Sequence, residues 1–209
     1  DFLPYNFTFF ILLRWQPPVP VVKWSPQTIN ATQPPPACSQ PPNSIWSIRT
    51  SSGVRDFSQI SEDCLYLNIF TPLLNNSSST SSLPVMLFIH GGGFRAGSAS
   101  DPSYESEHLV NTTNVIVVLL QYRLGVLGFL ATGNGRDDIK GNYGILDQRL
   151  AIAWVKANIE VFGGDPNQIT LFGQSAGAQS TALHFITQDM QSFFQQAIIE
   201  SAPFTVPFR

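Results

Sequence analysis

The chain has 209 residues, of which 43% are apolar, 12% are aromatic and only 12% are charged, about half the charged share of an average soluble domain. Sixteen Phe and a mean hydropathy of +0.05 exclude a disordered chain, because burial of so much apolar surface offsets the entropy lost on folding. A net charge of −3 without a basic run excludes nucleic-acid binding by phosphate neutralisation, and no apolar run is long enough to predict a membrane-spanning helix.

The amino-terminal segment, residues 1–13, is atypical. The chain begins with Asp1, and the apolar stretch 7–13 has no basic residue before it, whereas a signal peptide has a positively charged first region. We expect either that a leader has been removed or that the sequence begins inside a longer protein. The length fits one domain or a part of a larger one.

A Pro-rich stretch follows, over residues 14–45. It is predicted to wrap the surface of a domain, because Pro is excluded from central strands and from the interior of long helices. The chain has two cysteines, Cys38 and Cys64. They are too few for a structural zinc site, which takes four ligands, and their number alone leaves open two buried thiols or one disulfide.

Asn-x-Ser/Thr acceptors for N-glycosylation occur slightly more often than the composition predicts. They are Asn6, Asn30, Asn75, Asn76 and Asn111. Together with the cysteines they favour a secreted protein or one of the secretory pathway, where disulfides form and persist.

Strands alternate with helices over the rest of the chain. Strands are predicted at 65–70, 84–89, 115–120 and 169–172, helices at 142–161 and from 176 to about 187, and a helical turn with a last strand within 193–200. A polar segment at 75–82 is predicted to be a loop, and the Gly-rich sequence at 163–166 to end the first helix. This alternation is typical of an α/β domain with a mainly parallel sheet.

Gly173-Gln174-Ser175-Ala176-Gly177 matches G-x-S-x-G, the nucleophile-elbow motif, in which Ser lies on a strained turn between a strand and a helix. Chance gives this pattern about one time in ten in such a composition, but here a predicted strand precedes it and a predicted helix follows it. A side chain at either Gly would crowd the neighbouring strand or helix. Ser175 is therefore the candidate catalytic nucleophile.

His90-Gly91-Gly92-Gly93-Phe94 follows the second predicted strand. Attack of a serine on a carbonyl group passes through a tetrahedral intermediate with a negatively charged oxygen, which preorganised N–H groups stabilise. Because Gly has no side chain to obstruct that oxygen, the backbone N–H groups of Gly92, Gly93 and Ala176 are predicted to form an oxyanion hole. His90 is expected to make local hydrogen bonds rather than to act as a base.

Four stretches are similar to the type-B carboxylesterases, the group of α/β-hydrolases that includes cholinesterases, carboxylesterases and neuroligins. These are residues 61–70 (SEDCLYLNIF), 90–94 (HGGGF), 122–130 (YRLGVLGFL) and 141–177. The resemblance covers the chain from about Arg14 to its end and implies an α/β-hydrolase fold whose carboxyl-terminal half is absent. Its parts would be an atypical segment (1–13), a Pro-rich wrap with a disulfide loop (14–60), and a core with the oxyanion loop and the elbow (61–209).

The resemblance implies hydrolysis of small carboxylic esters through an acyl-enzyme on Ser175, without a metal or organic cofactor. It also implies a Cys38–Cys64 disulfide and two buried ion pairs, Arg14–Glu62 and Arg123–Asp147. Oligomeric state is not predicted. Choline esters are not favoured as substrates, because Val54 and Gln174 stand where cholinesterases have a Trp and a Glu.

The other two members of a catalytic triad are not found in the sequence. In α/β-hydrolases an acid and then a His follow the nucleophile, and His184, the one His after Ser175, would lie about 13 Å along the same helix. His108 is expected to be an exposed residue in a polar connection. We therefore expect either a part of a longer serine esterase that is inactive alone, or a catalytically silent cholinesterase-like adhesion domain.

Overall fold

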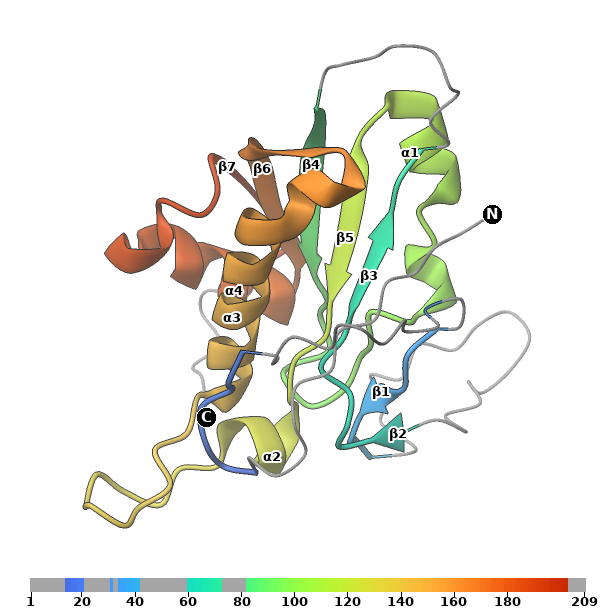
Figure 1. The fold of residues 1–209 in the computed structure, drawn as a ribbon. Helices are drawn as coiled ribbons and strands as arrows, with labels where there is room; N and C mark the ends of the chain where they lie inside the picture. The colour runs from blue at the N-terminus through green and yellow to red at the C-terminus, as the bar shows by residue number, and fades with distance from the viewer. Residues whose placement is uncertain (1–13, 21–30, 32–33, 42–59, 73–81, 203–209) are drawn as a thin grey trace, which may run out of the picture.

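The computed structural model describes residues 14–20, 31, 34–41, 60–72 and 82–202 (Figure 1). Four predicted glycosylation acceptors, Asn6, Asn30, Asn75 and Asn76, lie outside these residues. So do the amino-terminal segment 1–13 and Val54, the residue that stands where cholinesterases have a Trp.

A five-stranded sheet forms the centre of the molecule, in the order β3-β5-β4-β6-β7. The strands are β3 (Leu67–Phe70), β4 (Leu83–Ile89), β5 (Ile116–Leu120), β6 (Gly164–Gln174) and β7 (Gln196–Glu200). Only β3 runs antiparallel to its neighbour, while the other three pairs are parallel. The prediction of an α/β-hydrolase fold with a mainly parallel sheet is confirmed.

Helices cover both faces of the sheet (Figure 1). They are α1 (Glu107–Thr113), α2 (Gly125–Phe129), α3 (Tyr143–Asn158) and α4 (Ala176–Ile186), with 3-10 turns η2 (Pro102–Tyr104), η3 (Ile159–Phe162) and η4 (Gln188–Met190). Side chains alternate between the faces along a strand. Thus Val118 of β5 packs in the cluster that holds Ile152 of α3, while Val117 packs with Val110 of α1.

Three local predictions need correction. Helices α1 and α2 were not predicted, and His108 lies in α1 rather than in an irregular connection, although it is exposed as expected. The long helix α3 ends at Asn158 and continues as a 3-10 turn up to Gly163, which has a φ of 85°. Strand β6 begins five residues earlier than predicted, because Gly164 already pairs with Leu83.

Cys38 and Cys64 form a disulfide, which confirms the pairing that the resemblance implied. Cys38 ends the short strand β1 (Ala37–Cys38), which pairs in parallel with β2 (Ile60–Ser61). Both cysteines are buried in the main core. The disulfide therefore fastens the Pro-rich wrap to the core.

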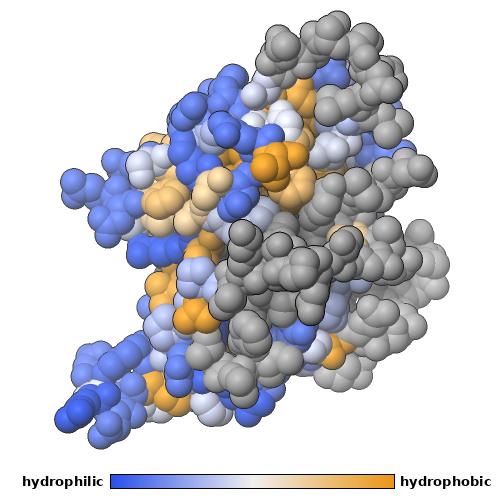
Figure 2. All heavy atoms as spheres, viewed as in Figure 1, coloured by the Kyte–Doolittle hydropathy of each residue, from blue (hydrophilic) through white to orange (hydrophobic). Residues whose placement is uncertain are grey.

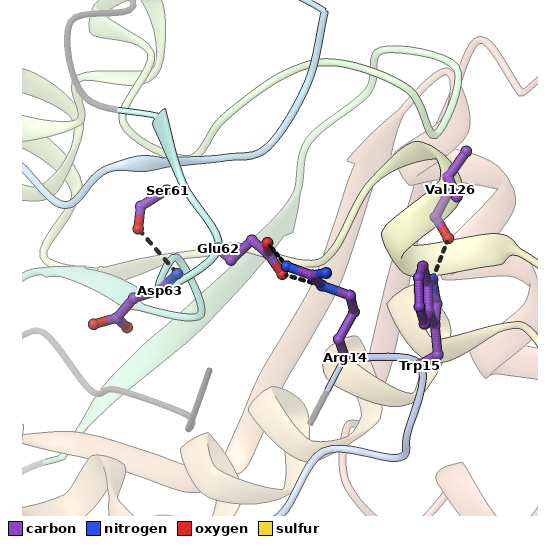
Figure 3. Close-up of polar contacts among 6 residues, drawn as sticks. All are labelled: Arg14, Trp15, Ser61, Glu62, Asp63 and Val126. Carbon is purple, nitrogen blue, oxygen red and sulfur yellow. Dashed lines mark hydrogen bonds and ion pairs between the residues drawn. The ribbon is translucent and has the colours of Figure 1, made fainter. Parts of the chain in front are cut away.

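The ion pair between Arg14 and Glu62 forms, but it lies at the surface (Figure 3). Arg14 Nε donates to Glu62 Oε2 at 2.8 Å, and a second nitrogen contacts Oε1. The two side chains are 51% and 30% exposed, so the prediction that this pair is buried is wrong. Next to it, Trp15 donates to the carbonyl of Val126 in α2 at 3.2 Å, a second polar contact between the wrap and the core.

The ion pair between Arg123 and Asp147 is buried as predicted, with side-chain exposures of 11% and 1%. Arg123 follows β5 and Asp147 lies in α3. Their side chains make a two-pronged contact, Nε to Oδ2 at 2.8 Å and Nη2 to Oδ1 at 2.7 Å, and the backbone N–H of Arg123 donates to the same carboxylate at 3.0 Å. The pair joins the end of β5 to the first turns of α3.

Apolar side chains are interspersed with hydrophilic ones on the face shown in Figure 2. Exposed apolar residues also occur in α4 and β7, among them Phe185, Ile186, Ile198 and Ile199. In the part of the chain that the structure describes, no helix has both the length and the apolar character to cross a bilayer.

Candidate active site

Ser175 lies between the end of β6 and the start of α4, as the G-x-S-x-G motif predicted. Its φ of 55° and ψ of −119° are a combination that residues with a side chain rarely adopt, and such strain collects at functional sites. Two backbone bonds stabilise this conformation: the N–H of Ser175 donates to the carbonyl of Glu200 at the end of β7, and its carbonyl accepts from Gln179, both at 3.0 Å.

The glycines of the motif permit close backbone contacts. A Cβ on Gly177 would lie 1.9 Å from the carbonyl oxygen of Ile89, and a Cβ on Gly173 would lie 2.5 Å from the backbone of Gly177. These distances are far below van der Waals contact, so the steric reason predicted for both glycines is confirmed. As a result, α4 starts directly against the end of β4.

Residues 91–97, here called the glycine turn, follow β4 and lie against the elbow. A Cβ on Gly91 would be 3.3 Å from Cβ of Ser175. The carbonyl of Gly92 accepts from the N–H groups of Arg95 and Ala96 at 3.1 Å each, and Gly92 and Gly93 have φ values of 114° and 62°, which favour Gly. The structure thus brings the candidate oxyanion loop next to the candidate nucleophile.

Open space lies beside Gly93, since a Cβ there would meet no atom within 4 Å. Ala176 is the first residue of α4, so its N–H has no acceptor within the helix, and the amino end of a helix favours negative charge. These features suit an oxyanion. The assignment of Gly92, Gly93 and Ala176 to the hole stays a prediction.

His90 makes local contacts, as expected. Its ring is fully buried, stacks on Tyr122 with 4.4 Å between ring centroids, and donates through Nδ1 to the carbonyl of Gly91 at 2.9 Å. The hydroxyl of Tyr122 donates to the carbonyl of His90 at 2.9 Å. Burial lowers the pKa of His90 to about 4, so the ring is neutral at neutral pH.

His184 is also buried, and its ring contacts α3 rather than Ser175. Its Nε2 lies 2.9 Å from Oε1 of Gln148, whose amide donates to the hydroxyl of Ser180 at 3.1 Å. Burial, followed by the charge of Arg149, lowers the pKa of His184 to about 4. No sequence pattern predicts this chain of polar side chains, because its members come from two helices and match no motif.

Residues 14–20, 31, 34–41, 60–72 and 82–202 contain no histidine whose ring is hydrogen-bonded to the hydroxyl of Ser175. The same residues hold no group of three or more His, Cys, Asp or Glu side chains placed to bind a metal ion. Gln174 is exposed beside Ser175 and contributes no charge there.

Acidification is expected to destabilise the fold between pH 6.5 and 4. The folded pKa values of His90 and His184, about 4, lie below the ordinary value near 6.5, so in this window the unfolded chain binds more protons than the native one. Each His should remove about 3 kcal/mol over the whole window. Denaturant unfolding at several pH values measures this, and His184→Gln should flatten the profile.

The Carboxylesterase family model matches residues 11–209. The chain is 42% identical to mouse (Mus musculus) "Cholinesterase" and 44% identical to mouse "Carboxylesterase 1E", over 94% and 90% of its length. It is 43% identical over 93% of its length to "Crystal protein" of Dictyostelium discoideum. In each comparison it spans about a third of the relative's length (32%, 33% and 33%). The family-specific stretches, the fold and these matches agree: the chain belongs to the carboxylesterase family.

Proposed function

We propose that the protein containing this chain hydrolyses small carboxylic esters through an acyl-enzyme on Ser175. The observation that carries the proposal is the strained conformation of Ser175 at the end of β6, next to the glycine turn. In this geometry Oγ attacks the ester carbonyl, and the N–H groups of Gly92, Gly93 and Ala176 stabilise the negative oxygen. The alcohol then leaves, and water cleaves the acyl-enzyme to the free acid.

The proton of Ser175 needs an acceptor. His184 and His90 are neutral, and the ring hydrogen bonds that they make go to Gln148 and to the carbonyl of Gly91 rather than to Ser175. The proposal therefore takes its general base, and the acid that orients it, from outside the described residues. Family membership supports an ester as the substrate.

Labelling of the whole protein with a fluorophosphonate probe tests the proposal. Such probes react covalently with an activated serine, so wild-type protein should label rapidly and Ser175→Ala should not label at all. Ser192→Ala, at an exposed serine in the turn before β7, is the matched control and should label like wild type.

Equal labelling of Ser175→Ala and wild type would contradict the assignment of the nucleophile. Folded wild-type protein that neither labels nor hydrolyses esters would favour the second possibility, a cholinesterase-like adhesion domain without catalysis. No feature of the elbow points to that second function, since Ser175 and the glycine turn are both intact.

We also propose that the protein matures in the secretory pathway and carries N-linked glycan. The Cys38–Cys64 disulfide supports an oxidising compartment. The acceptor Asn111 is exposed on α1, where a glycan would extend into solvent without contacting the sheet.

A further inference from the structure

Gln40 binds the far end of the glycine turn. Its Oε1 accepts from the N–H of Gly97 at 2.9 Å, and its Nε2 donates to the carbonyl of Gly97 at 2.9 Å. The same Nε2 donates to the carbonyl of Cys38 at 3.0 Å. One side-chain amide thus occupies both backbone groups of Gly97 and links them to the disulfide-bonded strand β1.

Gly97 packs closely against the beginning of the glycine turn. A Cβ on Gly97 would lie 2.5 Å from the carbonyl oxygen of Gly91 and 2.6 Å from Nδ1 of His90. Its neighbour Ala96 donates the bond that closes the turn on the carbonyl of Gly92. Displacement of Gly97 would therefore move the contacts that set the direction of the N–H groups of Gly92 and Gly93.

The adjoining parts of the chain have anchors of their own. The carbonyl of Phe94 accepts from the N–H of Gly125 at 2.7 Å. Gln121 donates to the hydroxyl of Ser98 at 2.9 Å and accepts from the N–H of Ala99 at 3.2 Å. Loss of the Gln40 amide should therefore loosen Gly97 without unfolding the whole loop.

We propose that Gln40 is a positioning residue for the oxyanion hole: through Gly97 it holds the glycine turn so that the N–H groups of Gly92 and Gly93 meet the negative oxygen. The inference rests on the proposed function of Ser175. Oxyanion stabilisation depends on donors already in place, and these donors act on the transition state more than on the bound ester. Loosening of the turn should therefore lower kcat and leave KM nearly unchanged.

The test uses the whole protein, with rates expressed per active site titrated by the phosphonate. Gln40→Met keeps the length of the side chain and removes its three hydrogen bonds. It should lower kcat about 10- to 100-fold, somewhat less than the loss of a complete oxyanion donor, with KM within about twofold. The inhibition constant of a trifluoromethyl ketone, whose adduct with Ser carries the oxyanion, should rise by the same factor as kcat falls.

Gln195→Leu is the matched control. Gln195 accepts from the N–H of Ile169 at 2.9 Å, a side-chain bond to backbone of the same kind, in the middle of β6 and six residues before Ser175. This variant should keep wild-type kcat. An equal fall of kcat in Gln195→Leu and Gln40→Met would mean general loosening and would overturn the inference.

Gln40→Glu supplies a second readout. A protonated carboxyl can accept from the N–H of Gly97 and donate to its carbonyl, as the amide does, whereas the ionised form only accepts. The ratio of its kcat to the wild-type kcat should be higher at pH 5, where part of the carboxyl is protonated, than at pH 8, where it is ionised. A ratio independent of pH, or a Gln40→Met kcat within twofold of wild type, overturns the role of Gln40. Failure of the proposed function gives a different result: either Ser175→Ala still hydrolyses the ester, or the wild-type protein does not hydrolyse it at all.

Discussion

Gly177→Ala is expected to abolish the folded elbow. The added Cβ would lie 1.9 Å from the carbonyl oxygen of Ile89 and 2.8 Å from its carbonyl carbon. These are backbone atoms of a central strand and cannot rotate away as a side chain would. The free energy of unfolding should fall by about 4 kcal/mol or more, at the upper end of single substitutions. The yield of folded protein on expression and the thermal unfolding of purified protein measure the effect.

Gly125→Ala is the control for this substitution. Gly125 also has a left-handed conformation, with a φ of 52°, but a Cβ there meets no atom within 4 Å. It should therefore cost only the conformational penalty of about 1–2 kcal/mol. Folded Gly177→Ala protein with wild-type stability would show that α4 does not start against β4 as described.

Arg123→Ala and Asp147→Ala are each expected to destabilise the protein by about 3–5 kcal/mol. Removal of either partner leaves a charge buried without its counter-charge, and that desolvation is the main cost. Burial raises the pKa of Asp147, and Arg123 opposes this rise by hydrogen bonding to the ionised carboxylate. Loss of Arg123 should therefore favour the neutral acid. Denaturant unfolding at pH 7 gives the free energies.

Two further variants separate burial from charge. Arg14→Ala breaks the surface pair with Glu62 and should leave Tm nearly unchanged, because exposed pairs contribute little. Arg123→Leu combined with Asp147→Leu removes both buried charges and should be less destabilising than either single change to Ala. Equal losses for Arg14→Ala and Arg123→Ala would contradict the difference in burial.

The sequence predicted the elements whose signal is local. The apolar run at 115–120 and the elbow motif predicted β5 and the turn at Ser175, because burial on both faces and the need for glycine leave a direct mark on residue types. Helix α2 was missed because its five residues, Gly125–Phe129, include two glycines, which disfavour helix. It is stabilised by contacts such as the bond from Gly125 to Phe94, which no local pattern records.

Contacts between distant segments of the chain could not be predicted from the sequence. The resemblance implied a buried pair of Arg14 and Glu62, yet both side chains lie at the surface. Gln40 matches no motif, and only the fold places it on Gly97, 57 positions later. The buried chain from His184 to Gln148 likewise depends on how α3 packs against α4.

The bond from the N–H of Ser175 to the carbonyl of Glu200 sets an order of events during synthesis. Ribosomes add about 5–20 residues per second, so Glu200 is joined to the chain about one to five seconds after Ser175. During that interval the serine lacks one of the two backbone bonds that hold it in its strained conformation. The nascent elbow can therefore reach its final geometry only after β7 has been made and has paired with β6.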